Sequence, residues 1–185
     1  MDIEGLGPAI IETFVNVGMI NKTYDIYNLD PDKIASLEGF KQTSAKNIIN
    51  SVNNSKKNDL SKLIFALGIR HIGAKAGKLL ADHFKNIDAI MNASVDDILE
   101  IDGFGVVMAQ SVVEFFESDS SKELIEKLKE VGVNMISTNV IKDNRFEGMT
   151  FVLTGTLPTL KRSEASSIIE SFGGKASSSV SKKTT

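Results

Sequence analysis

The stretch Ile101-Asp102-Gly103-Phe104-Gly105 lies between two segments of helical periodicity and has residue types suited to binding an anion. Two glycines flanking one large apolar residue let the backbone turn tightly and approach another surface. Phe104 can then be buried between the flanking helices, while the amides left free at the start of the next helix face outward. Such amides suit a DNA phosphate. The stretch is therefore a candidate phosphate-binding hairpin.

The pattern recurs along the chain, which indicates a repeat. Residues 37–41 match residues 101–105 at an offset of 64, and the match extends into the flanking segments. Pairs at this offset are Asp30 with Ser94, Ile34 with Ile98, Ala45 with Ala109, Ile48 with Val112, Ile49 with Val113 and Val52 with Phe116. Similar stretches supply four central apolar residues, Leu6, Phe40, Ile72 and Phe104, at spacings of 34, 32 and 32. Such a period is typical of units that bury their apolar faces on one another, so we expect these four residues in the core.

Charge is distributed unevenly around the hairpins. The formal net charge is −3, yet residues 37–85 hold nine Lys or Arg against three Asp or Glu, and residues 86–143 hold four against twelve. The basic block covers the second and third hairpins, where Lys41, Lys46, Arg70, Lys75 and Lys78 can attract a polyanion. The alternative interpretation is a solvated Lys-rich face.

Composition limits the possible classes of function. The chain has 185 residues, 42% of them hydrophobic and 24% charged, as in an ordinary globular protein. No Cys and only two His are present, which excludes a thiolate zinc site, disulfides and a cysteine nucleophile. Without an apolar run of membrane-spanning length or a signal-peptide pattern, we expect a cytoplasmic protein with no membrane partner.

Helices are expected on both sides of each hairpin. The periodicity predicts them at residues 9–17, 22–27, 31–37, from 43 or 44 onward, 60–67, after Gly73, after Ser94, after Gly105 and at 122–131. Asp30, Asp59 and Ser94 are expected helix caps, and Asp97 completes a capping box with Ser94. The polar residues 53–58 are expected to interrupt the pattern.

The period changes near the end of the chain. Residues 149–154 are β-rich, a helix carrying Ala165, Ile168, Ile169 and Phe172 follows, and residues 176–180 can form a second strand. This order predicts the opening of a parallel α/β unit. Because about forty residues rarely bury enough surface to fold alone, we interpret this part as an interrupted domain.

The order of these parts resembles the C-terminal region of bacterial NAD-dependent DNA ligases. The stretches at residues 2–7, 68–73 and 151–157 carry the resemblance, which covers essentially the whole chain. It implies a mainly α protein in which an array of four helix-hairpin-helix motifs precedes a truncated α/β unit of the BRCT type. The expected domains are a DNA-binding domain at residues 1–136, a linker at 137–147 and the N-terminal part of an incomplete BRCT domain at 148–185.

The resemblance also implies a function. In this family the hairpin domain closes on nicked duplex DNA through the minor groove, and the whole enzyme seals 3'-OH/5'-phosphate nicks in replication and repair. We expect contacts with phosphates to make binding independent of sequence. The DNA-binding residues carried over are Gly5, Gly7, Gly39, Lys41, Lys46, Arg70, His71, Gly73, Lys75, Gly103 and Gly105.

Catalysis is expected elsewhere in such a ligase. The family's Lys-x-Asp-Gly adenylation motif and four-cysteine zinc finger do not occur in this sequence. The resemblance therefore implies no catalytic residue and no cofactor in this chain, with NAD, Mg and the zinc finger belonging to other parts of the parent enzyme. The implied partners are nicked double-stranded DNA and the remaining ligase domains.

Several alternatives remain open at this point. Lys41 and His71 replace a glycine in their hairpins, which leaves the amide geometry there uncertain. Thr154 and Gly155 match signature positions of a BRCT domain and can contact a phosphate, so a protein-interaction or scaffold module is the second interpretation. Asp96, Asp97 and Asp102 are explained more simply by capping and an acidic turn than by metal, and His83 by a helix surface. A complete enzyme is not supported, since Gly103-x-Gly105 lacks the rest of a dinucleotide fingerprint.

Overall fold

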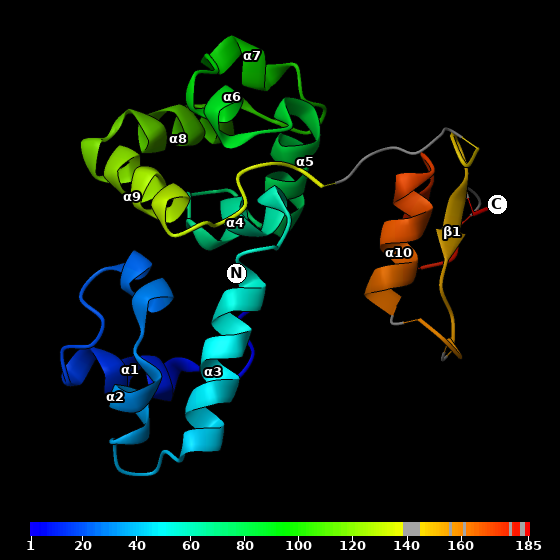
Figure 1. Ribbon diagram of the computed structural model, residues 1–185. Helices are drawn as coiled ribbons and strands as arrows, with labels where there is room; N and C mark the ends of the chain where they lie inside the picture. Colours follow the sequence, from blue (N-terminus) through cyan, green and yellow to red (C-terminus); the bar gives the residue numbers. More distant parts are fainter. Residues whose placement is uncertain (139–144, 156, 161, 178, 182–183) are drawn as a thin grey trace. The chain divides into compact units, whose positions relative to one another are not determined.

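The computed structural model describes residues 1–138, 145–155, 157–160, 162–177, 179–181 and 184–185. Residues 139–144 of the expected linker therefore lie outside the described part of the chain. The chain divides into two compact units, Met1–Ser137 and Thr138–Thr185. Figure 1 shows helices throughout the first unit, and a helix beside a strand in the second. Among the described helices none has the length and apolar content needed to cross a membrane.

The first unit is built from helices joined by short turns. In chain order they are α1 (Pro8–Asn16), the 3-10 helix η1 (Thr23–Asn28), α2 (Pro31–Ala35), α3 (Gln42–Ser55), α4 (Leu60–Ala66), α5 (Ala74–Phe84), α6 (Ile87–Met91), α7 (Val95–Leu99), α8 (Val106–Glu117) and α9 (Asp119–Glu130). Figure 1 shows α1 and α2 beside α3, while α4 to α9 gather around a second centre. The expected mainly α fold is confirmed.

Two hydrophobic cores correspond to these two groups of helices. The smaller core contains Phe14, Ile20, Ile34, Ala45, Ile48 and Val52, with Leu6 and Phe40 partly buried against it. The rings of Phe14 and Phe40 lie 5.7 Å apart between centroids. The larger core includes Ile72 and Phe104 together with residues from α4 to α9. The four central apolar residues therefore pack in pairs, two at each core.

The 64-residue repeat predicted from the sequence is confirmed by burial. Ala45, Ile48 and Val52 on α3 are buried in the smaller core, and their partners at the same offset on α8 are buried in the larger one. Those partners are Ala109, Val112 and Phe116. The repeat extends to the helices before the hairpins, since Ile34 and Ile98 are both fully buried.

Most expected helices form, with four main differences. The helix expected at 122–131 begins three residues earlier, since α9 starts at Asp119 after the Ser118 cap. The 22–27 segment is a 3-10 helix shifted by one residue at each end. α3 continues to Ser55, so the expected interruption at 53–58 begins too early; Ser55 is buried and its hydroxyl donates to the Val52 carbonyl at 2.7 Å. α6 was not expected: its five residues show no period, and its Asn86 cap was not recognised, whereas the equally short α2 and α7 were expected from their caps Asp30 and Ser94.

The predicted caps form at the expected residues. Asp30 accepts a hydrogen bond from the Asp32 amide at 2.9 Å, and Asp59 accepts one from the Ser61 amide at 2.9 Å. Gly77 allows the close approach of α5 to α4, because a Cβ there would lie 3.3 Å from the Ser61 carbonyl oxygen. These local features fix the direction of the helices that carry the hairpins.

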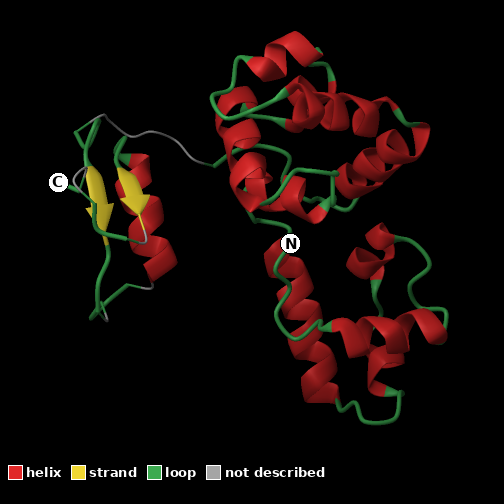
Figure 2. Cartoon of the chain, turned by 180° about the vertical axis from the view of Figure 1, so that it is seen from behind, coloured by secondary structure: helices red, strands yellow, loops and turns green. Residues whose placement is uncertain are grey.

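The second unit contains two parallel strands and one helix, as the sequence predicts. Strands β1 (Thr150–Val152) and β2 (Lys175–Ser177) pair in parallel with Phe151 opposite Ala176, and α10 (Arg162–Ser171) connects them (Figure 2). The ring of Phe146 contacts those of Phe151 and Phe172, with centroids 5.0 and 5.7 Å away. This small aromatic cluster lies within the unit.

Candidate nucleic-acid interface

Four hairpins precede α1, α3, α5 and α8 and share one backbone pattern. We name them hairpins 1 to 4: residues 3–7, 37–41, 69–73 and 101–105. In each, the amide of the central apolar residue donates to the carbonyl three residues earlier. The four bonds are Leu6 to Ile3 (3.2 Å), Phe40 to Leu37 (3.1 Å), Ile72 to Ile69 (3.0 Å) and Phe104 to Ile101 (3.0 Å).

The residue before the central apolar position has a left-handed backbone in every hairpin. The φ angles are 79° at Gly5, 84° at Gly39, 64° at His71 and 92° at Gly103. Glycine adopts this conformation without steric cost, whereas histidine does so less readily. His71 nevertheless keeps the common geometry, so its replacement of glycine does not alter the turn.

The residue after the central apolar position is extended and directly precedes the helix. The φ angles are −80° at Gly7, −119° at Lys41, −86° at Gly73 and −106° at Gly105. Any residue adopts such angles, so this position does not require glycine. Lys41 therefore fits hairpin 2 without strain, and the uncertainty about its geometry is removed.

The helices after the hairpins differ from the other helices of the unit in how they begin. α1, α3, α5 and α8 have no hydrogen bond from an N-cap side chain and no acidic residue in the first turn. At α3, however, the Ser44 hydroxyl accepts a hydrogen bond from the Lys41 amide at 2.9 Å. By contrast, α2, α4, α6, α7 and α9 are capped by Asp30, Asp59, Asn86, Ser94 and Ser118. Uncapped amides and a helix dipole without a nearby carboxylate form a site that favours an anion.

The surface above the hairpins is open. A Cβ added to any of their glycines would meet no heavy atom within 4 Å. These glycines are all exposed, and they are Gly5, Gly7, Gly39, Gly73, Gly103 and Gly105. The central residues lie beneath them, with Ile72 and Phe104 only 5% and 9% exposed. Each hairpin thus holds an apolar side chain inside and presents its main chain outside.

Free cations accompany hairpins 2 and 3. Lys41, Lys46, Arg70 and Lys75 are exposed, as is His71, and within the described part of the chain none of the four cations forms an ion pair. Lys62 and Lys78 are paired instead, with Asp2 at 2.9 Å and Asp82 at 3.5 Å. Hairpins 2 and 3 therefore combine uncapped amides with unneutralised positive charge.

Hairpins 1 and 4 have a different character. Each carries an exposed carboxylate, Glu4 or Asp102, as hairpin 2 does with Glu38, but neither has a cation in the hairpin or in the first turn of its helix. Hairpin 4 is followed instead by Val106 and Val107, which are 53% and 61% exposed. Sequence reasoning missed this apolar pair, although the buried positions Ala109 and Val112 place both valines outside the buried face of α8.

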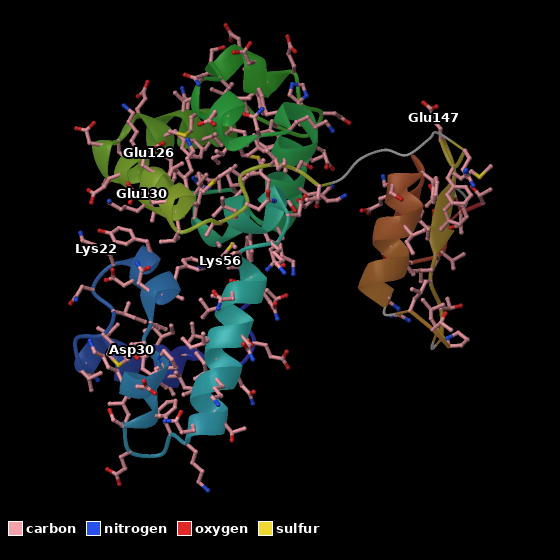
Figure 3. All side chains as sticks on the ribbon, viewed as in Figure 1. Lys22, Asp30, Lys56, Glu126, Glu130 and Glu147 are labelled. Carbon is pink, nitrogen blue, oxygen red and sulfur yellow. The ribbon has the colours of Figure 1, made fainter. Side chains whose placement is uncertain are left out.

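An acidic region lies away from the hairpins, on α9. Figure 3 shows Glu126 and Glu130 on this helix. Lys129 lies 3.0 Å from Glu126 and 2.7 Å from Asp88, and these hydrogen bonds raise the pKa of Lys129. Lys127 pairs with Glu130 at 2.7 Å. The lysines of this region thus neutralise carboxylates and differ from the free cations at the hairpins.

Asp97, one of the acidic residues considered as a metal ligand, caps a helix. Asp97 accepts from the Ser94 amide at 2.8 Å and from its hydroxyl at 2.6 Å, and these bonds lower the pKa of Asp97. His83 packs edge-on against Phe84, with centroids 4.7 Å apart. Among the described residues no group of three His, Cys, Asp or Glu is placed to hold a metal ion.

Thr154 and Gly155 lie in the second unit, in the loop after β1. Both are exposed, and Gly155 has a left-handed backbone with φ 74°. The Gly155 carbonyl accepts a hydrogen bond from the Arg162 guanidinium at 3.2 Å. A cation from the start of α10 therefore lies next to this pair.

Comparison with known protein families identifies the modules. A family model described as SAM-like helix-hairpin-helix tandem matches residues 1–54, and one described as helix-hairpin-helix motif matches residues 62–125. The BRCA1 C Terminus (BRCT) domain model matches residues 142–185. The two helix-hairpin-helix matches coincide with hairpins 1 and 2 and with hairpins 3 and 4.

Similar proteins align with the whole chain. A DNA ligase of Acetivibrio thermocellus is 51% identical, and DNA ligases of Carboxydothermus hydrogenoformans and Clostridioides difficile are each 48% identical. In each case the alignment covers 100% of this chain and 28% of the ligase, so the chain spans little more than a quarter of these relatives. By these matches the chain is similar over its whole length to the C-terminal part of these DNA ligases, and it contains helix-hairpin-helix and BRCT modules.

Proposed function

We propose that the first unit binds duplex DNA through its phosphates, independently of sequence, as the non-catalytic part of an NAD-dependent ligase that seals nicks. The main support is the contrast at the helix starts. Each helix after a hairpin lacks a hydrogen bond from an N-cap side chain and lacks a first-turn carboxylate, whereas α2, α6, α7 and α9 have both. The one capping contact at these four starts is the Ser44 hydroxyl of α3, which accepts from the Lys41 amide and leaves the first amides of the helix itself without a side-chain acceptor. Amides left without a protein acceptor at four repeated sites suit repeated phosphates.

The free cations support the same proposal. Lys41, Lys46, Arg70 and Lys75 belong to the two middle hairpins and the helices that follow them, and no carboxylate among the described residues neutralises them. Each cation that meets a phosphate releases condensed counterions and contributes to affinity in a salt-dependent way. Main-chain amides and flexible cations contact phosphate oxygens and carry little information about base sequence.

Catalysis belongs, in this proposal, to other parts of the ligase. The sequence holds no Lys-x-Asp-Gly motif and no Cys. NAD, Mg and the zinc finger of the parent enzyme are therefore assigned outside these residues, together with the domains that act on the nick. The role left to this chain is to hold nicked duplex DNA for those domains.

Charge variants test the proposal. We expect Lys41→Gln and Arg70→Gln each to reduce the slope of log affinity against log salt concentration by about 0.9, because each removes one phosphate contact. Fluorescence anisotropy with a labelled nicked duplex at several salt concentrations measures that slope. The matched control is Lys122→Gln on α9, which removes the same charge at an exposed site away from the hairpins. Equal effects of all three variants would show that only net charge matters and would contradict site-specific binding.

A second function is supported for the BRCT module by one observation. The guanidinium of Arg162 lies against the Gly155 carbonyl, beside Thr154. We propose that this end of the second unit can receive a phosphate on a protein partner. Binding of a phosphorylated peptide to wild type but not to Arg162→Gln would support this role, and equal binding to both would oppose it.

A further inference from the structure

A groove of about 750 Å³ runs between hairpins 1 and 2. Glu4 and Gly5 of hairpin 1 and Gly39 and Phe40 of hairpin 2 contribute to its walls. The remaining wall comes mainly from α3, whose contribution includes Asn47, Asn50 and Asn54. We call these three residues the asparagine face.

The side chains of the asparagine face make no hydrogen bond within the described part of the chain. All three side chains are exposed. They recur at intervals of three and four residues, which places them along one side of the helix. Asparagine is a less favourable helix former than alanine. With Asn53, which lies outside the groove, α3 carries four exposed asparagines, and no side-chain hydrogen bond to a described residue offsets their cost.

The charge around the face favours an anionic ligand. Residues 39–58 contain four lysines and no Asp or Glu, in a chain with 24 acidic residues overall. Lys41 and Lys46 lie at the start of α3, and Lys56 follows its last turn (Figure 3). Glu4, at hairpin 1, is the single charged residue in the lining of the groove. None of these lysines lines the groove, and the Lys56 ammonium lies 5.8 Å from the centroid of the Tyr27 ring. A phosphodiester in the groove would thus meet neutral side-chain amides along α3, within a segment whose charges are positive.

We propose that the asparagine face binds the sugar-phosphate backbone of one DNA strand, in the interval between the phosphates held by hairpins 1 and 2. This inference rests on the proposed function of the hairpins. Each side-chain amide offers two N–H donors and one acceptor without a charge. Such groups commonly contact phosphate and sugar oxygens. The face therefore adds hydrogen bonds along the strand. Because its side chains are uncharged, it releases no counterions and does not change the salt dependence of the affinity.

The neutral character of these contacts gives a distinctive test. In the triple variant Asn47→Ala, Asn50→Ala and Asn54→Ala, the affinity for a labelled duplex should fall by about tenfold or more at every salt concentration. The salt slope should stay that of the wild type, whereas Lys41→Gln should lower it. Because alanine is the better helix former, the melting temperature of the variant should not fall. Asn53→Ala is the matched control, since Asn53 is exposed on α3 but does not line the groove.

The possible outcomes distinguish failure of this inference from failure of the proposed DNA binding by the hairpins. A triple variant that binds like the wild type, while Lys41→Gln still lowers the slope, would overturn the asparagine face and leave the hairpins in place. A triple variant with a reduced slope would overturn the neutral contact. Absence of salt-sensitive binding by the wild-type chain would overturn the proposed function and this inference with it. Weaker binding with an unchanged slope, and no effect of Asn53→Ala, would support both.

Discussion

Replacement of Gly73 by asparagine would add the side-chain cap that α5 lacks. Gly73 has φ −86° and ψ −178°, which asparagine adopts readily, and a Cβ at this position would meet nothing within 4 Å. An N-cap asparagine accepts a hydrogen bond from the second or third amide of the helix. The stability of the protein should therefore rise by roughly 0.3 kcal/mol, the usual advantage of this cap over glycine.

The same change should weaken DNA binding. The new side chain would occupy an amide that we assign to a phosphate, and a hydrogen bond to a charged group contributes about 1.5 to 3 kcal/mol. Loss of one such bond raises the dissociation constant about 10- to 150-fold. Thermal unfolding and fluorescence anisotropy on the same preparation measure the two opposite effects together.

A control separates the cap from the substitution itself. Ser94 already caps α7, which follows no hairpin, so Ser94→Asn exchanges one cap for another and should leave DNA affinity unchanged. The reasoning would be refuted if Gly73→Asn stabilised the protein yet bound DNA as tightly as the wild type. In that case the amides at the start of α5 would not meet a phosphate.

Two further predictions concern single residues of the hairpin repeat. His71→Gly should stabilise the protein by about 1 kcal/mol, because the left-handed φ of 64° suits glycine; DNA affinity should fall with the loss of the imidazole, and unchanged affinity would limit hairpin 3 to its main chain and Arg70. Ser94→Ala should raise the pKa of Asp97 toward its ordinary value, because it removes the hydrogen bond from the Ser94 hydroxyl, the largest cause of the lowered pKa, and keeps the bond from the backbone amide. A carboxyl with a lowered pKa in the folded state adds to the free energy of unfolding above the ordinary pKa of Asp, and this contribution is lost as the pH falls through the folded pKa. The free energy of unfolding of the variant should therefore fall less than that of the wild type over this acidic range. An NMR titration of the Asp97 carboxyl carbon checks the shift, and an identical midpoint in both proteins would contradict the assigned cause.

The repeat could be predicted from sequence because its signals are local. The spacing of apolar residues and the turn residues between them survive in any context, and burial of Ala45 and Ala109 at matching positions follows from the same period. Caps such as Asp30 and Ser94 were likewise predictable, since their hydrogen bonds reach only two or three residues along the chain.

Features that depend on tertiary packing could not be predicted from the sequence. α3 extends through two asparagines because Val52 and Ser55 are buried on its inner side, and packing overrides the weak propensity. The left-handed backbone at His71 is held between Ile69 and Ile72, which are buried on either side of it. The groove beside the asparagine face arises only when hairpins 1 and 2 come together.

The most direct test of the central claim is a salt titration of duplex binding by the wild-type chain. Fluorescence anisotropy with nicked, intact and single-stranded DNA gives the affinity at each salt concentration. Binding through about four to eight phosphates predicts a log–log slope between about −4 and −7 on duplex DNA, with little dependence on base sequence. An affinity that does not change with salt would contradict phosphate binding by the hairpins.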